Sequence, residues 1–262
     1  MSKNTHNPLK LCVEVSLLLA WGITAGVKAD SKLPDTLARV KPSIVAVGTY
    51  LPKRSPRANF LGTGFVVGQG NLVVTNAHVV PELLDIEHLE KMAIFYRQGN
   101  DEKMQTATEV AVDKDHDLAV LKIAEPLPAL KLGDAALVKE GQVYAFTGYP
   151  IGMVLGLYPV THRGMVSAIT PNAIPTLRAG QINPKLLRRL DAPYNVFQLD
   201  ATAYPGNSGS PLYDADNGNV VGVIDKVFVQ ESKENLLSNP SGISYAIPVD
   251  YVTSLLKDKN LH

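Results

Sequence analysis

The sequence is poor in cysteine and aromatic residues and has no excess of charge of either sign. Of its 262 residues, Cys12 is the only cysteine and 6% are aromatic, while 25 Lys and Arg residues balance 25 Asp and Glu residues. A fold stapled by intramolecular disulfides is therefore excluded. The balanced charge also argues against the strongly basic surface of a nucleic-acid-binding protein, so we expect no nucleic acid among its partners.

The N-terminal segment differs in character from the rest. Lys3 and Lys10 precede a mostly apolar run, Leu11–Val27, and Ala29 ends a motif typical of signal-peptide cleavage. This pattern predicts a signal peptide over residues 1–29, with cleavage near Ala29 and export to the periplasm or the medium. The alternatives are that this segment stays on the protein as a short membrane anchor or is an ordinary buried segment. No later run approaches the ~20 apolar residues of a spanning helix, so we expect no membrane span in the mature chain.

From residue 44 onward, short apolar runs rich in Val, Ile, Tyr and Phe alternate with Gly, Pro, Asn and Asp, a pattern of strands and turns. A connector with two prolines, Glu125–Pro128, separates two sets of six runs. The first set is Ile44–Tyr50, Gly64–Val67, Leu72–Thr75, Met92–Tyr96, Gln105–Val112 and Leu118–Ile123. The second set is Gln142–Thr147, Val160–Ile169, Val196–Asp200, Ser210–Tyr213, Val220–Val229 and Ile243–Ile247. The predicted fold is all-β, with two tandem six-stranded antiparallel barrels over about 37–125 and 135–248, because closure removes exposed strand edges.

Few segments favour helix. The apolar spacing in Pro81–Met92 predicts a short helix after the third strand. Asn183 and Pro184 have the order of an N-cap and a first helical residue, and predict a helix up to Leu190. A short C-terminal helix is expected over about Val249–Lys257.

Three residues whose side chains can together catalyse hydrolysis occur at strand ends or in a turn. His78 follows an apolar strand, Asp117 precedes another, and Ser208 lies in the glycine-bracketed turn Gly206–Ser210. A serine hydroxyl is a weak nucleophile at neutral pH and needs a base such as imidazole within hydrogen-bond reach. A carboxylate then holds the imidazole in its working tautomer. Two observations exclude an α/β-hydrolase fold. The three residues occur in the order His, Asp, Ser, which is not the order of that fold, and Ser210 stands where its nucleophile turn has glycine.

The segments Thr75–Val80, Asp117–Leu121 and Gly206–Gly209 resemble those of trypsin-like serine proteases, most closely the HtrA (Deg) branch, and the likeness covers about residues 37–251. It implies a double β-barrel with His78, Asp117 and Ser208 as the catalytic triad. The backbone N–H groups of Gly206 and Ser208 would form the oxyanion hole. HtrA proteases usually carry C-terminal PDZ domains, and here we expect a protease domain without one.

Other histidines and carboxylates are weaker candidates. His116 would point to the opposite face of its strand from Asp117. Asp113 and Asp115 are expected to be solvated in a turn. His88 falls in the predicted helix 81–92, and His162 falls within a strand. None of these residues shows metal-ligand spacing, so no metal and no cofactor are expected.

The resemblance also places a substrate pocket. Thr202, six residues before the serine, would form its floor, and its walls would be Ile224, Asp225, Lys226, Val227 and Ile243. A threonine floor supplies no carboxylate for Lys or Arg, and an isoleucine wall favours small or medium apolar side chains. The Asp225 side chain is expected to face away from the pocket. If it turned inward, its carboxylate would upset this preference.

These observations predict a serine endopeptidase that hydrolyses exported or unfolded polypeptides through an acyl-enzyme on Ser208. A protease-like scaffold that binds peptides without turnover, and a maturation protease dedicated to one partner, are the alternatives. The oligomeric state is open, with a homo-oligomer as one option. The long insertion Asn172–Asp191 is expected, on the resemblance, to regulate the active-site loops.

Overall fold

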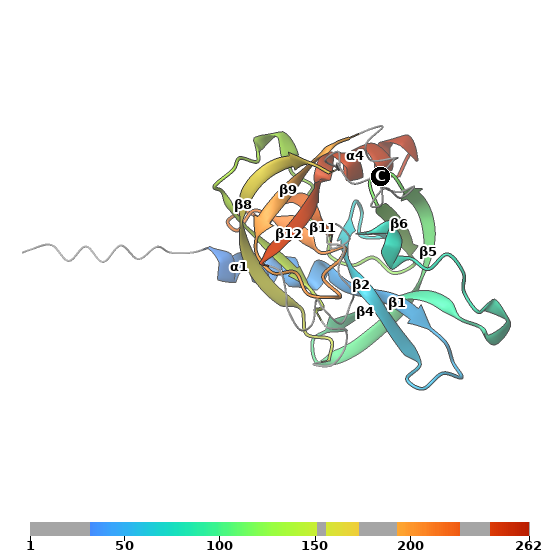
Figure 1. Cartoon of the computed structure of the whole chain (residues 1–262). Coiled ribbons are helices and arrows are strands. Elements are labelled where there is room, and N and C mark those ends of the chain that lie inside the picture. The colour runs from blue at the N-terminus through green and yellow to red at the C-terminus, as the bar shows by residue number, and fades with distance from the viewer. Residues whose placement is uncertain (1–31, 151–155, 173–192, 226–241, 262) are drawn as a thin grey trace, which may run out of the picture. The chain divides into compact units, whose positions relative to one another are not determined.

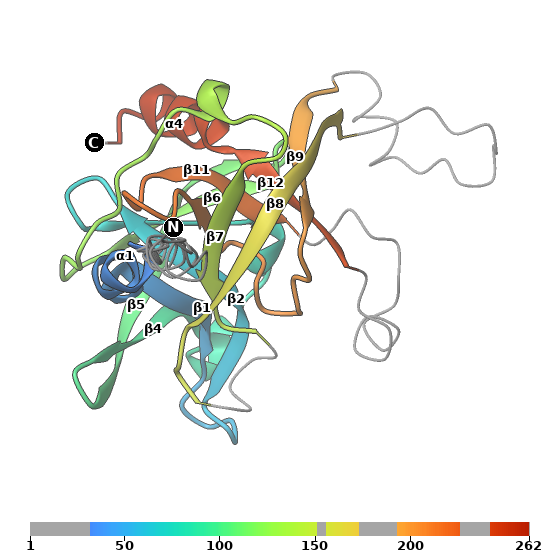
Figure 2. The ribbon, with the colours of Figure 1, turned by 90° about the vertical axis from the view of Figure 1, so that its left-hand side faces the viewer.

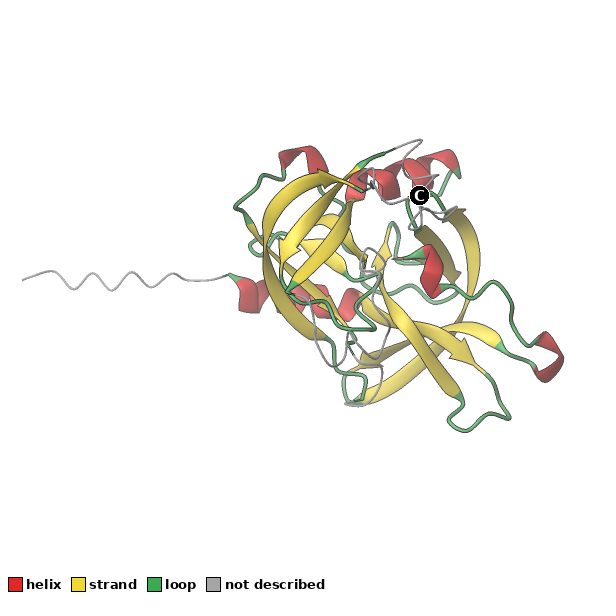
Figure 3. Cartoon of the chain, viewed as in Figure 1, coloured by secondary structure: helices red, strands yellow, loops and turns green. Residues whose placement is uncertain are grey.

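The computed structural model describes residues 32–150, 156–172, 193–225 and 242–261, and strands dominate their regular structure (Figure 1, Figure 3). The predicted leader, the helix expected up to Leu190, most of the 172–191 insertion, and Lys226 and Val227 lie outside the described residues. The remaining predictions can be compared with the structure directly.

The first half of the chain forms a closed antiparallel barrel with the strand order β1-β2-β3-β6-β5-β4. Closure means that every strand has two hydrogen-bonded neighbours and no edge is left open. Its strands are β1 (Ile44–Tyr50), β2 (Ala58–Val67), β3 (Leu72–Thr75), β4 (Lys91–Gln98), β5 (Asp101–Asp113) and β6 (Leu118–Ile123).

The second half forms another closed antiparallel barrel with the order β10-β11-β12-β9-β8-β7. Its strands are β7 (Val143–Gly148), β8 (Val160–Pro171), β9 (Asn195–Asp200), β10 (Pro211–Tyr213), β11 (Val220–Asp225) and β12 (Ile243–Pro248). The predicted fold of two six-stranded barrels is confirmed.

Two strands begin earlier than their apolar residues indicate. β2 starts at Ala58, which pairs with Tyr50, and β5 starts at Asp101, which pairs with Gln98. In β5 the added residues are all exposed, whereas in β2 they run from exposed Asn59 to buried Gly62 and Thr63. The backbone ladder continues there because the partner strand is present.

The helix predicted over Pro81–Met92 is wrong. The segment contains only a single 3-10 turn, η4 (Ile86–His88), and β4 begins at Lys91. Leu83, which was to lie on the buried face of the helix, is 90% exposed, and Ile86 is 74% exposed. An apolar stripe stabilises a helix only where a neighbour covers it, and Leu83, Ile86 and Leu89 are all left exposed.

A helix that the sequence analysis did not predict, α1 (Leu33–Val40), precedes the first barrel. Proline occupies its first turn, where the missing N–H has no helical partner to lose. Thr36 donates its hydroxyl to the carbonyl of Asp216, which lies in the turn between β10 and β11. This helix therefore docks on the second barrel while its buried C-terminal residue, Val40, leads into the first.

The predicted C-terminal helix is confirmed as α4 (Val249–Asp258). Val249, Val252 and Leu255 recur at every third position and are all buried. The helix packs against β11 (Figure 2). It also contacts β5 of the first barrel. In the described part of the chain, no helix has the length and apolarity to cross a membrane.

The two barrels meet through specific polar contacts as well as packing. Tyr149, just after β7, donates its hydroxyl to the carbonyl of Ile44 at 3.3 Å, and burial raises the pKa of this phenol. Thr63 of β2 donates its N–H to the carbonyl of Ser208 at 2.8 Å. The serine turn of the second barrel is thus held directly against the first.

Candidate active site

The position of His78 is fixed by the residues just before it. β3 ends at Thr75, and Asn76 and Ala77 lead into the 3-10 turn η3 (Ala77–Val79). The side-chain amide of Asn76 and the N–H of Ala77 both donate to the carbonyl of Asp117 at 3.0 Å. The buried asparagine therefore ties the histidine segment to the residue that its ring must meet.

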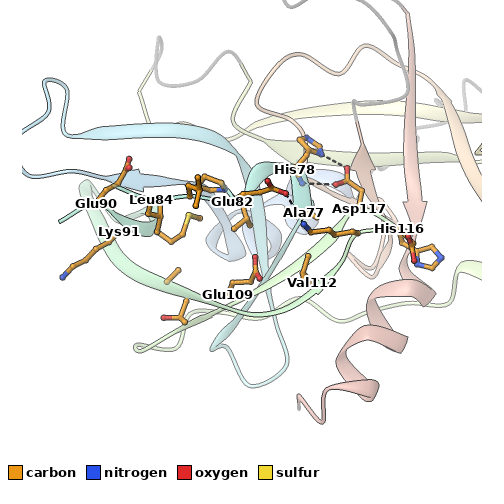
Figure 4. A pocket seen from close by; sticks show the side chains of 18 of the residues that line it. Ala77, His78, Glu82, Leu84, Glu90, Lys91, Glu109, Val112, His116 and Asp117 are labelled. Carbon is orange, nitrogen blue, oxygen red and sulfur yellow. Dashed lines mark hydrogen bonds and ion pairs between the residues drawn. The ribbon is translucent and has the colours of Figure 1, made fainter. Parts of the chain in front are cut away.

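Asp117 accepts two hydrogen bonds from His78. Its Oδ1 accepts the backbone N–H at 2.9 Å and its Oδ2 accepts Nδ1–H of the ring at 2.6 Å (Figure 4). A carboxylate only accepts, so the ring proton lies on Nδ1, and Nε2 is left as the acceptor. Asp117 has φ +54°, a left-handed conformation that the surrounding hydrogen bonds stabilise.

Ser208 lies in a tight, buried turn of the second barrel. Gly206 and Gly209 on either side have φ +98° and +85°, which favour glycine. A Cβ atom on Gly209 would lie 2.0 Å from the carbonyl oxygen of Thr63. The N–H of Ser210 donates to the carbonyl of Asn207 and closes the turn. The glycine bracket in the sequence is therefore a conformational requirement of this turn.

Thr63 contacts this turn at several points, and the sequence analysis did not single it out. Its N–H donates to the carbonyl of Ser208, and its hydroxyl donates to the carbonyl of Gly206 at 2.7 Å. The same hydroxyl accepts the N–H of Tyr149 at 2.9 Å. Its own carbonyl accepts the hydroxyl of Thr75. One side chain of the first barrel therefore orients the backbone on which the expected oxyanion hole depends.

The residues expected to form the substrate pocket fall into two groups. Ser244 of β12 donates its hydroxyl to the carbonyl of Ala201 and accepts the N–H of Ala203. These bonds hold half-buried Thr202 beside the start of β12, where Ile243 is 45% exposed. Ile224, by contrast, is fully buried in the hydrophobic core.

Asp225 ends β11 beside the His78–Asp117 pair. It has no exposed surface, and one of its carboxylate oxygens lies within 4.8 Å of a ring nitrogen of His78 and of a carboxylate oxygen of Asp117. Histidine and two aspartates are also donor types that divalent cations use. Here Nδ1 of His78 and Oδ2 of Asp117 are 2.6 Å apart, a hydrogen-bond distance, so these two ligand types are engaged with each other.

A hollow of about 1910 Å³ extends from the His78–Asp117 pair beneath the 81–90 segment and along β5 (Figure 4). Its lining includes Leu84, Met92 and Val112. Neither Ser208 nor Thr202 lines it. It is therefore a different cavity from the pocket expected at Thr202.

The other histidines among the described residues, His88, His116 and His162, have partners of their own. The expectation that Asp113 is solvated is wrong, because it accepts the ring N–H of His116 at 2.6 Å. Burial acts to raise the pKa of Asp113, but hydrogen bonds from the His116 ring and backbone outweigh it and hold that pKa below its ordinary value. His116 also stacks on Tyr251 of α4 with 3.9 Å between ring centroids. This second His–Asp pair anchors the C-terminal helix.

His88 and His162 lie apart from the His78–Asp117 pair in their contacts. His88 forms an exposed ion pair with Asp85 at 2.8 Å. His162 stacks on Phe146 with 4.9 Å between ring centroids, and burial lowers its pKa.

Two closed antiparallel barrels, with a His–Asp pair on one and a tightly turned serine on the other, define the class of two-barrel peptidases. Residues 62–223 match the model of the trypsin-like peptidase domain. The chain belongs to this family.

Named relatives are consistent with this assignment. The chain is similar to proteins called "Probable periplasmic serine endoprotease DegP-like" from Halomonas elongata, at 34% identity over 72% of the chain, and from Marinomonas sp., at 31% over 80%. These matches cover 33% and 37% of the two relatives, so the chain spans only about a third of their length. The solved structure "HtrA-type protease AlgW with decapeptide" has a similar fold, with TM-score 0.62 and 24% identity over 88% of this chain and 68% of that one.

Proposed function

We propose that this protein is a serine endopeptidase that cleaves exported or unfolded polypeptides through an acyl-enzyme on Ser208. The observation that carries the proposal is the double hydrogen bond between His78 and Asp117, formed on one barrel while the other presents Ser208 in a fixed turn. The family assignment supports the same chemistry.

In this mechanism His78 is the general base. Its Nδ1–H is held by Asp117, so Nε2 takes the proton of the Ser208 hydroxyl as the oxygen attacks the peptide carbonyl. The carbonyl carbon becomes tetrahedral and its oxygen becomes negative. The backbone N–H groups of Gly206 and Ser208 stabilise that oxyanion. His78 then returns the proton to the leaving amine, and water repeats the sequence to release the acyl group from Ser208.

The side chain before the scissile bond is proposed to bind between Thr202 and Ile243. The hydrogen bonds of Ser244 to both sides of Thr202 support a fixed pocket floor there. The floor presents a hydroxyl and a methyl group, and Ile243 adds exposed apolar surface. Peptides with small or medium apolar residues at this position should be cleaved faster than peptides with Lys or Arg.

Export is the second part of the proposal. Lys3, Lys10 and the apolar run to Val27 are typical of a signal peptide, and the named relatives are called periplasmic. Protein recovered from the periplasm or medium should begin near Asp30. Mass spectrometry that finds Met1 on such material would support a retained anchor instead.

Covalent labelling by a fluorophosphonate probe tests the chemistry directly. The wild-type protein should be labelled and should hydrolyse casein, and Ser208→Ala should lose the label and several orders of magnitude of rate. Ser167→Ala, which alters an exposed serine of β8, is the matched control and should behave as wild type. Labelling without casein hydrolysis would favour a dedicated maturation protease. Absence of labelling in folded wild-type protein would favour the peptide-binding scaffold.

A further inference from the structure

Three large apolar side chains of the 81–90 segment are exposed. Leu83 is 90% exposed, Ile86 74% and Leu89 61%. Leu83 and Ile86 also line the hollow that extends from the His78–Asp117 pair. A single exposed leucine is ordinary on a protein surface, but a group of large apolar side chains within so short a segment marks a place of interaction.

Hydrogen bonds to Glu90 hold this segment in one conformation. Its Oε1 accepts the hydroxyl of Thr49 at 2.6 Å and the guanidinium of Arg54 at 2.8 Å. Its Oε2 accepts the backbone N–H of Asp85 at 3.1 Å, and the half-buried side chain of Leu84 packs on the core of the first barrel. The apolar side chains are therefore presented from a fixed segment, and a partner that binds them meets a preformed surface.

The hollow joins this apolar surface to the His78–Asp117 pair. His78 and Asp117 line it together with Leu83 and Ile86, and Val112 of β5 adds apolar surface (Figure 4). Pockets that enclose small molecules measure about 300–1,000 Å³. At about 1910 Å³ the hollow is larger than these, so its size suits a run of polypeptide residues better than a small ligand. A chain that occupies it lies against the histidine of the proposed reaction.

We propose that the hollow, with the exposed side chains of Leu83 and Ile86, is a docking site for an apolar segment of the polypeptide substrate near the bond that is cleaved. This inference rests on the proposed function, because it takes the chain that docks to be the chain that His78 and Ser208 cleave. A folded protein buries most of its apolar runs, whereas an unfolded polypeptide exposes them. The docking site therefore favours unfolded substrates over folded ones.

Charged groups around the hollow influence which apolar segments fit. Glu82 and Lys114 pair with each other at 3.1 Å on the surface. Glu109 and Asp115 add two exposed carboxylates to the lining, against the exposed ammonium group of Lys91. An apolar segment flanked by basic residues should therefore bind more tightly than the same segment flanked by acidic residues.

Binding of fluorescently labelled casein, an unfolded polypeptide, to the Ser208→Ala protein measures docking without cleavage. Adding Leu83→Ser and Ile86→Ser to this protein should raise the Kd about tenfold, because two side chains lose the apolar surface that they bury on binding. Leu83→Met with Ile86→Met keeps that surface and should preserve the Kd. Leu137→Ser is the matched control, since Leu137 is 69% exposed and does not line the hollow. A Kd of the double serine variant within about twofold of its parent overturns the proposal.

Hydrolysis by the protein with Ser208 intact separates this inference from the proposed function. N-acetylvaline p-nitrophenyl ester is too short to reach the docking site, whereas casein reaches it. The ratio of kcat/KM for casein to kcat/KM for the ester should fall about tenfold when Leu83 and Ile86 are both serine. Hydrolysis of both substrates with an unchanged ratio overturns the docking site and leaves the protease intact.

Two further outcomes have separate meanings. Lack of hydrolysis of either substrate by the wild type overturns the proposed function, while casein binding still decides whether the hollow holds unfolded chains. Sedimentation of the wild type and of the double serine variant tests the other occupant, a second copy of this chain. Loss of an oligomer in the variant, with an unchanged casein-to-ester ratio, would assign Leu83 and Ile86 to a contact between copies and overturn the proposal.

Discussion

Replacement of Thr63 by valine removes one hydroxyl at the junction of the barrels and keeps the shape of the side chain. That hydroxyl donates to the carbonyl of Gly206 at 2.7 Å and accepts the N–H of Tyr149 at 2.9 Å. Thr63 is fully buried, so water does not replace the lost partner without a rearrangement. The variant therefore leaves one backbone acceptor and one backbone donor without their hydrogen bonds.

The expected loss of stability follows from these two groups. Each buried polar group left without a partner costs about 1–3 kcal/mol, and local relaxation recovers part of it. We expect the free energy of unfolding of Thr63→Val to fall by about 2–4 kcal/mol. For a domain of this size, each kcal/mol lowers Tm by about 2–4 °C, so Tm should fall by roughly 5–15 °C. Because the carbonyl of Gly206 loses its donor, kcat should also fall, by about tenfold.

Urea unfolding and steady-state kinetics of the wild type, Thr63→Val and Thr63→Ser measure both effects. Serine keeps the hydroxyl and loses only a methyl group, so it controls for packing. Unfolding free energies of the valine and serine variants within about 0.5 kcal/mol of each other would refute a stabilising role of the Thr63 hydroxyl. An unchanged kcat in the valine variant would separate the hydroxyl of Thr63 from the orientation of the serine turn.

Two further predictions concern a turn and a buried carboxylate. Gly209→Ala should destabilise the protein far more than Gly141→Ala. Both glycines have positive φ, but only a Cβ atom at position 209 would meet a backbone atom, at 2.0 Å. Equal decreases in Tm for the two variants would contradict this prediction. The pKa of Asp113 is lowered in the folded state, so its charge contributes stability above about pH 4 that is lost as the pH falls further. Urea midpoints of wild type and Asp113→Asn should therefore differ most near pH 7 and converge toward pH 2–3, and a constant difference across this range would contradict the role of the His116–Asp113 pair.

The strands were predictable because each combines a run of β-favouring residues with turn residues at its ends. Ile44–Tyr50 and Leu118–Ile123 match the structure at both ends for this reason. His78 and Asp117 could be placed together because the strands that carry them, β3 and β6, are neighbours in a closed barrel. Local pattern and barrel closure thus determine most of the fold.

Features that depend on distant parts of the chain could not be predicted in this way. Thr63 is important because it forms hydrogen bonds with Tyr149, 86 positions away, and with Gly206, more than 140 positions away. The side chain of Asp225 lies near His78 only because two barrels meet there. For the 81–92 segment the local pattern itself was misleading. Its apolar spacing favoured a helix, but the fold supplied no surface to cover Leu83.

The division of the proposed catalytic groups between the barrels also has a consequence during synthesis. The N-terminal barrel contains His78 and Asp117, so both partners of this hydrogen-bonded pair come from one barrel. Ser208, the proposed nucleophile, follows Asp117 by some ninety residues, and Thr63 joins it to the first barrel only when the second has folded. On the proposed mechanism, a chain that lacks the second barrel would hold the base without the nucleophile, and hydrolysis would require both barrels to be complete and docked.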